Sequence, residues 1–429
     1  MTLQINTIIQ GDALEVLKTL PDESVDAVIT DPPYGLKFMG KHWDYDVPSI
    51  EIWQECLRVL KPGGYLLSFA GTRTQHRMAC RIEDAGFEIR DMIAWVYGSG
   101  FPKSLNVGKA VDKLQGNERE DLGKHPNSRE TLGNIQICKK NGKGRLTKGT
   151  PDWEGWGTAL KPALEPITVA RKPLSEKTVA ENVLKWGTGG INIDACGVGT
   201  EDNLNGGAYS TSEDGMSQNE IFGKYYKKPG QYQQPSGRWP ANFIHDGSDE
   251  VLGLFPQSKG CQPHRITSKN KKYQGWGTIT NKQGEMIGYS GLGSAARFFY
   301  CAKASKAERN AGCEGLEEKV GGSMMANSGD TMQLGGASLK GEPKQKIPDR
   351  NHHPTVKPIA LMEYLIKLVS RDGALVLDPY CGSGTTAIAC HNLNRNYICI
   401  ENEEEFVVIA EARVKEARRG QLALFGVKK

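Results

Sequence analysis

The chain has 429 residues, which is enough to bury a large core and to form two lobes. Its formal net charge is only +4, so binding of a polyanion depends on local basic patches rather than on overall charge. The N-terminus lacks the pattern of a signal peptide, no stretch is apolar enough to span a membrane, and the ten cysteines show no zinc spacing. We therefore expect a cytoplasmic protein with reduced thiols and no metal site.

The first part of the chain alternates strands with helices. Strands are expected at 5–10, 25–30, 65–69 and 88–97, and helices at 13–20, 50–60 and 72–85. The sequence Lys61-Pro62-Gly63-Gly64 predicts a turn before the third strand. This alternation predicts a mostly parallel sheet with helices on both faces.

The pattern changes in the middle of the chain. The segment 98–160 is rich in Gly, Lys and Asn and is interpreted as a loop insert, before one more strand at 164–171. From about 176 to 345 glycine, serine and lysine predominate, and 297–302 is the clearest strand. Regular spacing then returns with a helix at 359–369, a strand before Asp378, a helix from Thr385, a strand at 397–400 and a helix at 404–418.

This order predicts an α/β fold with a doubly wound sheet assembled from both ends of the chain. Residues 1–175 and 346–429 are expected to form the two parts of that domain, and 176–345 an inserted polar lobe. Ligands of such sheets bind beyond the C-terminal ends of the strands, near the point where the strand order reverses.

A glycine turn follows the strand that ends at Asp378. It reads Asp-Pro-Tyr-Cys-Gly-Ser-Gly-Thr (378–385) and leads into a helix of small residues. Glycines let a ligand approach the backbone, and the helix N-terminus offers free N–H groups. The turn alone is also compatible with an ordinary βα connection. The next strand ends at Glu401, where an acidic residue can accept hydrogen bonds from both hydroxyls of a ribose, and this spacing favours an adenosine cofactor.

A second turn, Asp31-Pro32-Pro33-Tyr34, follows the strand at 25–30. The two prolines fix the backbone and remove two N–H donors, so the carbonyls and the Asp31 carboxylate form an acceptor-rich pocket that suits an exocyclic amine. Tyr34 offers a flat face for stacking a base. In isolation the tetrapeptide is better interpreted as a rigid turn after a strand. Together with the Asp378 turn it predicts one shared cleft, because both turns leave C-terminal strand ends.

The two motifs in this order resemble those of β-class DNA amino-methyltransferases, which methylate adenine N6 or cytosine N4 with S-adenosylmethionine. The resemblance covers about the first hundred residues, the strand at 164–171 and residues 352–401, and the run Asn-His-His-Pro-Thr-Val-Lys-Pro (351–358) fits the family motif before the cofactor turn. It implies a Rossmann-like methyltransferase sheet with a target-recognition region in the middle. One departure is Tyr380-Cys381, where the family usually has Phe and a small residue.

The resemblance also implies a role for individual residues. The catalytic motif would be Asp31, Pro32, Pro33 and Tyr34. The residues implied to bind the cofactor are Asp12 with the Ala13 backbone at the adenine ring, Glu401 at the ribose, Thr355 and Lys357 at the methionine carboxylate, and Asp378, Gly382, Ser383, Gly384 and Thr385 around the methionine part.

Three basic runs contain no acidic residue, at 139–148, 224–239 and 259–282. The last two also contain aromatic side chains, and the first lies in the glycine-rich insert. Each alone is equally a solvated loop, but three of them in the region where the family binds DNA favour phosphate contact and base stacking. We therefore expect double-stranded DNA as the partner.

The most specific hypothesis is a site-specific DNA adenine-N6 methyltransferase that acts on a flipped-out base, because Asp31 begins the motif where cytosine-N4 enzymes more often have Ser. Cytosine N4 is the alternative. An RNA or protein methyltransferase is less favoured, because those enzymes more often have Asn-Pro-Pro-Tyr and place the cofactor turn first. A DNA-binding module without catalysis is disfavoured by the intact motifs. The resemblance further implies a bacterial or phage protein, often a homodimer and sometimes paired with a restriction enzyme.

Overall fold

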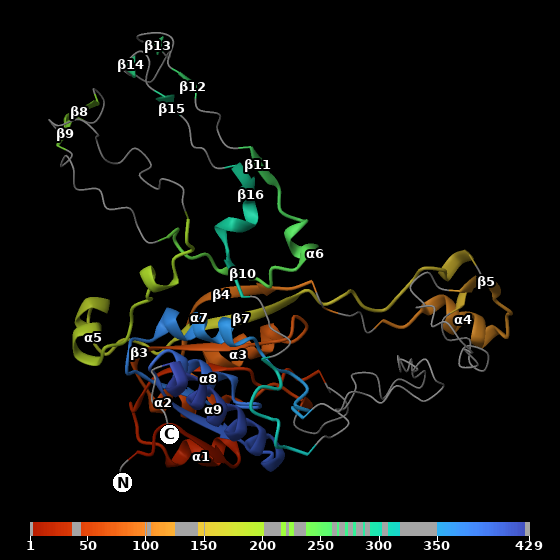
Figure 1. The fold of residues 1–429 in the computed structure, drawn as a ribbon, viewed down its shortest axis with the longest axis horizontal. Coiled ribbons are helices and arrows are strands. Elements are labelled where there is room, and N and C mark those ends of the chain that lie inside the picture. Colours follow the sequence, from red (N-terminus) through yellow and green to blue (C-terminus); the bar gives the residue numbers. More distant parts are fainter. Residues whose placement is uncertain are drawn as a thin grey trace.

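The computed structural model describes residues 3–36, 44–98, 100, 104–124, 145–149, 151–200, 216–219, 223–226, 237–259, 264–265, 271–272, 278–279, 286–287, 292–302, 308–317 and 350–424. Its centre is a nine-stranded sheet with the strand order β1-β19-β18-β2-β3-β7-β4-β10-β17 (Figure 1). These strands are β1 (Thr7–Gln10), β2 (Val25–Thr30), β3 (Leu60–Phe69), β4 (Glu88–Val96), β7 (Leu164–Arg171), β10 (Phe243–His245), β17 (Tyr300–Cys301), β18 (Leu375–Asp378) and β19 (Asn396–Glu401).

The sheet joins the two ends of the chain, as the sequence predicts. β18 pairs in parallel with β2, so that Leu377 lies beside Val28, and β19 pairs in parallel with β1. Every neighbouring pair is parallel except those of β7, which runs antiparallel to both β3 and β4. The reversed direction of β7 becomes important at the functional site, because it carries the start of that strand to the edge where the others end.

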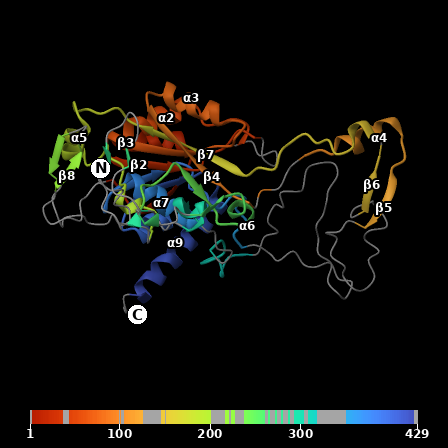
Figure 2. The ribbon, with the colours of Figure 1, turned by 90° about the horizontal axis from the view of Figure 1, so that it is seen from above.

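Helices cover both faces of the sheet, as Figure 2 shows for α2 and α3 on one side and α7 and α9 on the other. Their bounds are α1 (Ala13–Thr19), α2 (Ile50–Val59), α3 (Gln75–Asp84), α7 (Ile359–Val369), α8 (Thr385–Asn392) and α9 (Glu404–Leu424). Successive residues of a strand point to opposite faces, so Ile398 packs with the α1–α3 side and Cys399 with the α7–α9 side. Burial on both faces explains why these strands read as continuous apolar runs.

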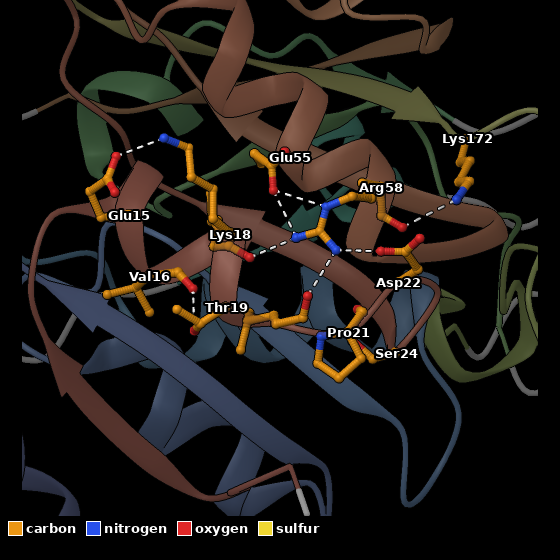
Figure 3. A network of polar contacts seen from close by, with 12 residues as sticks. Glu15, Val16, Lys18, Thr19, Pro21, Asp22, Ser24, Glu55, Arg58 and Lys172 are labelled. Carbon is orange, nitrogen blue, oxygen red and sulfur yellow. Dashed lines mark hydrogen bonds and ion pairs between the residues drawn. The ribbon is translucent and has the colours of Figure 1, made fainter. Parts of the chain in front are cut away.

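A polar network on the α1–α2 side fixes the two helices to each other (Figure 3). The Arg58 guanidinium of α2 donates to the carbonyl oxygens of Leu17 and Leu20, each at 2.8 Å, and pairs with Glu55 at 2.7 Å. Carbonyls at the end of a helix lack part of their partners within the helix, and Arg58 adds a donor to that of Leu17 and to that of the C-cap residue Leu20.

Two local predictions are wrong. Residues 61–64 do not separate a helix from a strand but belong to β3, as an irregularity between the pairs Val25–Leu60 and Ala27–Tyr65. The polar groups of this bulge have partners, since Asn182 and Thr188 donate to the Pro62 carbonyl. The predicted strand at 297–302 shortens to β17, because residues 295–298 form a 3-10 turn.

The segment 98–160 is not a plain loop in its described parts. It contains α4 (Val107–Gln115) and an antiparallel pair, β5 (Glu120–Lys124) with β6 (Arg145–Lys148), which project from the sheet (Figure 1). Arg119 joins these elements by pairing with Asp112 and with Glu154. Its described parts therefore form a small folded unit with an ion-pair network of its own, in which the Asp112 carboxylate is buried.

The middle region contributes both to the sheet and to the periphery. β10 and β17 extend the sheet beyond β4, so residues inside the predicted lobe 176–345 belong to the central layer. The other elements are α5 (Val179–Trp186), α6 (Asp249–Leu252), β8 (Met216–Asn219), β9 (Gly223–Tyr226), β11 (Gln257–Lys259), β12 (His264–Arg265), β13 (Lys271–Lys272), β14 (Thr278–Ile279), β15 (Met286–Ile287) and β16 (Leu292–Ser294). Most of the three basic runs lies outside the described residues, and their role remains a prediction. In the described part, no helix combines the length and hydropathy that crossing a bilayer requires.

Candidate active site

The two sequence motifs lie side by side at the C-terminal edge of the sheet. Asp31 follows β2 and Asp378 ends the neighbouring strand β18. A hydrogen bond joins the strand ends directly, because the Thr30 hydroxyl donates to Asp378 Oδ1 at 2.7 Å. The predicted meeting of the two turns is therefore confirmed.

The Asp31 carboxylate has two close partners. Lys357 Nζ lies 2.6 Å from its Oδ2, and the Tyr34 hydroxyl donates to its Oδ1 at 2.6 Å. The loop after the motif is held by the Asp44 carboxylate, which accepts hydrogen bonds from the backbone N–H groups of Tyr34 and Gly35 at 2.7 and 2.8 Å. Asp31 is thus fixed in place with both oxygens aligned before any substrate is present.

A second carboxylate, Glu165, completes this cluster and is not identified from the sequence. Its Oε2 lies 3.2 Å from Lys357 Nζ and 3.0 Å from the Tyr34 hydroxyl. Glu165 is near the start of β7, and the antiparallel direction of that strand brings its start to the edge where β2 and β4 end. The sequence shows an acidic residue at the start of an apolar strand, but it does not show the direction of that strand.

The charges of the cluster follow from its partners. Burial lowers the pKa of the Lys357 ammonium, but the Asp31 and Glu165 carboxylates outweigh this effect and raise the pKa above its ordinary value. Burial and the same two carboxylates raise the pKa of the Tyr34 phenol well above 10. At neutral pH the cluster therefore contains a charged lysine and a protonated tyrosine.

The glycine turn is supported from below by Asp378. This carboxylate is 2% exposed, and it accepts hydrogen bonds from Thr30, from the Tyr380 backbone and from the Thr386 hydroxyl. Burial raises the pKa of Asp378 to about 6. Its carboxylate therefore shapes the turn from inside the fold.

Arg413 of α9, a residue absent from the sequence-based site, lies beneath the same turn. Its guanidinium Nη1 donates to the Ser383 carbonyl at 2.6 Å, to the Ser383 hydroxyl at 2.9 Å and to the Thr385 hydroxyl at 3.2 Å. Burial lowers the pKa of Arg413. These bonds join α9 to a turn that lies 30 residues earlier in the chain, so no local pattern indicates them.

Gly384 is required by both its backbone conformation and its surroundings. Its φ is +81°, and an added Cβ would lie 2.9 Å from the Ala410 Cβ and 3.0 Å from the Ala410 Cα. We expect Gly384→Ala to lower the free energy of unfolding by about 2–5 kcal/mol, from left-handed strain and overpacking together. Urea denaturation measures it.

Gly373→Ala is the matched control for Gly384→Ala. Gly373 has a similar φ of +74°, but an added Cβ would meet nothing within 4 Å. Its cost should therefore be the backbone strain alone, about 1–2 kcal/mol. Equal losses in the two variants would contradict a steric role for the contact with α9.

Glu401 and Asp12 lie beside the glycine turn on the next two strands. The Glu401 carboxylate accepts hydrogen bonds from the Gly382 N–H at 2.8 Å and from the Glu403 N–H at 2.9 Å. Asp12 caps α1 by accepting from the Glu15 N–H at 3.2 Å, and the Ala13 backbone begins that helix. Burial raises the pKa of Glu401. Two carboxylates from neighbouring strands thus lie on one side of the glycine turn.

The segment before α7 brings Lys357 to the catalytic cluster and His353 to the glycine turn. The His353 ring packs edge-on against Phe406 at 4.5 Å and would lie 2.9 Å from a Cβ on Gly382. Thr355 is exposed, and its carbonyl oxygen lies 2.6 Å from His353 Nδ1. The resemblance assigns Thr355 and Lys357 to the methionine carboxylate. In this structure the lysine ammonium lies on Asp31, and the role of Thr355 stays a prediction.

His353 gives the protein a pH-dependent stability. Burial lowers the pKa of its ring to about 4, below the 6.5 of an ordinary histidine. Between these values the unfolded chain binds a proton that the folded chain does not. The contribution of His353 to the free energy of unfolding is therefore fully present above pH 6.5 and decreases toward pH 4. We expect this decrease to be smaller in His353→Gln by about 3 kcal/mol, at 1.36 kcal/mol per pKa unit.

The measurement is urea denaturation of both proteins at several pH values. His76→Gln, which changes an exposed ring on α3, serves as the control and should keep the wild-type slope. A His353→Gln protein with that same slope would contradict the assignment.

Comparison with known proteins agrees with this geometry. A family model described as DNA methylase, for N6 and N4 methyltransferases, matches residues 25–412. The type II methyltransferase M.HpaI of Haemophilus parainfluenzae is 42% identical over 72 residues, which is 17% of this chain and 23% of the relative. M2.MboI of Moraxella bovis is 47% identical over 64 residues, again 23% of the relative, so these closer matches span under a quarter of each protein.

Two longer matches are more distant. The type II methyltransferase M.HindIII of Haemophilus influenzae is 21% identical, with 96% of this chain and 95% of the relative covered. Among solved structures, the cytosine-N4-specific PvuII DNA methyltransferase has a TM-score of 0.41 at 13% identity, with 99% of this chain and 95% of that chain covered.

Proposed function

The chain belongs to the DNA methylase family of N6 and N4 methyltransferases, and on this premise we propose that it transfers a methyl group from S-adenosylmethionine to an exocyclic amine of DNA, the N6 of adenine. The observation that carries the proposal is the juxtaposition of two strand ends. The Asp31 carboxylate, with Lys357 and Tyr34, stands next to the turn of Gly382 and Gly384.

The residues at the glycine turn fit an adenosine cofactor. Glu401 and Asp12 offer carboxylate oxygens that keep further lone pairs for the hydroxyls of a ribose and the amine of an adenine. Gly382 and Gly384 have positive φ, a conformation that favours glycine. Because glycine has no side chain, the turn that Ser383 and Thr385 complete stays open to a ligand. These residues would hold the cofactor, with Asp378 and Arg413 fixing the turn from beneath. When bound, the cofactor supplies a methyl group that its sulfonium charge activates.

The catalytic cluster suits a poor nucleophile. The lone pair of an exocyclic amine is delocalised into the ring, and hydrogen bonds from its N–H groups to Asp31 and to a carbonyl of Pro32 or Pro33 favour a pyramidal nitrogen. Since the amine of a duplex base is paired and stacked, the base must first leave the helix, and Tyr34 offers a face on which to stack it. Positioning of the two reactants then supplies much of the rate.

Asp31 also serves the end of the reaction. Methylation would leave a surplus proton on the target nitrogen. The Asp31 carboxylate, which already accepts its N–H, is positioned to take that proton. Lys357 balances the carboxylate charge until then.

Adenine is favoured over cytosine because the motif begins with Asp31, where cytosine-N4 enzymes more often have Ser. The test is incubation of the protein with duplex DNA and isotopically labelled cofactor, followed by digestion to nucleosides and mass spectrometry. N6-methyladenine is the expected product. N4-methylcytosine alone would move the proposal to the alternative base, and label in RNA or protein but not in DNA would overturn it. A homodimer and a cognate restriction enzyme remain predictions from the resemblance.

A further inference from the structure

The catalytic cluster contains one carboxylate more than the accepting motif needs. Asp31 and Glu165 both pair with Lys357, at 2.6 and 3.2 Å, and both lie within hydrogen-bond distance of the Tyr34 hydroxyl. All three charged side chains are largely shielded, with exposures of 18%, 19% and 9% for Asp31, Glu165 and Lys357. A shielded carboxylate is costly unless it is paired, so Glu165 is held there by specific contacts.

The position of Glu165 is rigid. Glu165 lies opposite Trp95 in the antiparallel pairing of β4 and β7. The carbonyl of the following residue, Pro166, accepts a hydrogen bond from the Ala70 N–H at 3.0 Å. Burial, together with the charge of the nearby Glu165 carboxylate, raises the pKa of Tyr97. Glu165 thus belongs to an inner strand of the sheet, whereas Asp31 and Lys357 lie on turns.

The cluster has a conflict that Glu165 resolves. Lys357 and Tyr34 occupy both oxygens of Asp31, which are also the acceptors that the target amine needs. An ammonium whose only carboxylate were Asp31 would compete with the amine for that carboxylate. Glu165 offers the same ammonium and the same hydroxyl a second acceptor within 3.2 Å.

We propose that Glu165 is a positioning residue of the methyl transfer: it holds Lys357 and Tyr34 when the target amine takes their place on Asp31. This inference rests on the proposed function of the site. It assigns the two carboxylates different tasks, since Asp31 accepts the substrate and Glu165 keeps the surrounding donors in register. Removing the Glu165 charge ties Lys357 to Asp31 alone and closes the acceptor to the amine.

The main test is Glu165→Gln, which keeps the shape of the side chain and removes its charge. We expect the single-turnover rate of DNA methylation to decrease about 10- to 100-fold, equivalent to about 1.4–2.7 kcal/mol, with the dissociation constant of the cofactor within about twofold of wild type. Glu165→Asp, which restores the charge, should recover part of the rate and supplies the same comparison if the glutamine variant does not fold.

The matched control is Glu88→Gln at the opposite end of the same strand pair. Glu88 lies on β4 and pairs with the buried Arg171 of β7 at 2.6 Å, so it repeats the charge pairing away from the site. This variant should keep the wild-type rate. A rate loss in Glu88→Gln equal to that in Glu165→Gln would reduce Glu165 to a structural ion pair.

A double-mutant cycle separates positioning from general damage. In a Lys357→Met background, Glu165→Gln should change the rate by less than about threefold, because the ammonium it positions is gone. Full additivity of the two substitutions would overturn the proposal, as would a Glu165→Gln rate within threefold of wild type.

One readout does not depend on methyl transfer. Acetylation of Lys357 by acetic anhydride at pH 9, followed by mass spectrometry of its peptide, should be at least about threefold faster in Glu165→Gln, because the ammonium loses a carboxylate that stabilises its charged form. Equal acetylation rates in the two proteins would contradict the contact between Glu165 and Lys357, even if the wild-type protein proved inactive on DNA. Conversely, if the wild-type protein methylates DNA and Glu165→Gln does so at the same rate, this inference is wrong and the proposed function is unaffected.

Discussion

Asp31→Ala should lower the single-turnover rate of DNA methylation by about 10²–10⁴-fold, the range expected for a side chain that accepts a proton in the reaction. The substitution removes the acceptor of the target amine and leaves the cofactor turn unchanged. The protein should stay folded, because Lys357 and Tyr34 keep Glu165 as a partner at 3.2 and 3.0 Å. Without that second carboxylate, the loss of Asp31 would leave a buried ammonium unpaired.

Rapid-quench measurement of methyl incorporation at saturating cofactor and DNA gives the rate, and titration calorimetry gives cofactor affinity. Asp91→Ala, on the outward part of β4, is a control that removes an exposed carboxylate and should keep the wild-type rate. A turnover near wild type in Asp31→Ala would show that another group accepts the amine.

Glu401→Ala should weaken cofactor binding by about 10- to 150-fold for each lost hydrogen bond to the carboxylate, at about 1.5–3 kcal/mol per bond. The structure adds a second reason for a large effect. Glu401 also accepts the Gly382 N–H at 2.8 Å, so its removal frees the backbone of the glycine turn as well as the ribose contact. The rate at saturating cofactor should change less than the affinity.

Glu401→Gln distinguishes the two contributions, because the amide oxygen can still accept the Gly382 N–H while the charge is lost. Its affinity should lie between those of the wild type and of Glu401→Ala. Glu404→Ala, at the exposed start of α9, is the control for removing a nearby acid. An unchanged cofactor dissociation constant in Glu401→Ala would place the ribose contact elsewhere.

The sequence predicts what lies within one strand and the turn that follows it. Asp31, Asp378 and Glu401 each end a buried run, so a rule about parallel strand ends is sufficient to place them at one edge. The structure joins these strand ends by the bond between Thr30 and Asp378 and by the bond from the Gly382 N–H to Glu401.

The missed residues depend on information that local patterns lack. Glu165 reaches the site because β7 runs against its neighbours, and strand direction leaves no periodic signal. Arg413 acts across two packed helices, which only tertiary contacts reveal. The error at 61–64 has the same origin: Pro and Gly usually end an element, but here side chains from 182 and 188 satisfy the bulge.

The bond between Thr30 and Asp378 spans 348 residues of chain, and this separation determines when the proposed site can first assemble. On the ribosome, β2 is synthesised long before β18, and the edge of β2 that pairs with β18 stays open during that interval. Asp31 has no glycine turn beside it during that time, so a chain that ends between β2 and β18 cannot assemble the proposed active site. Pairing of two strands so far apart in the chain slows folding, and the unpaired edge of β2 is exposed to aggregation until β18 pairs with it.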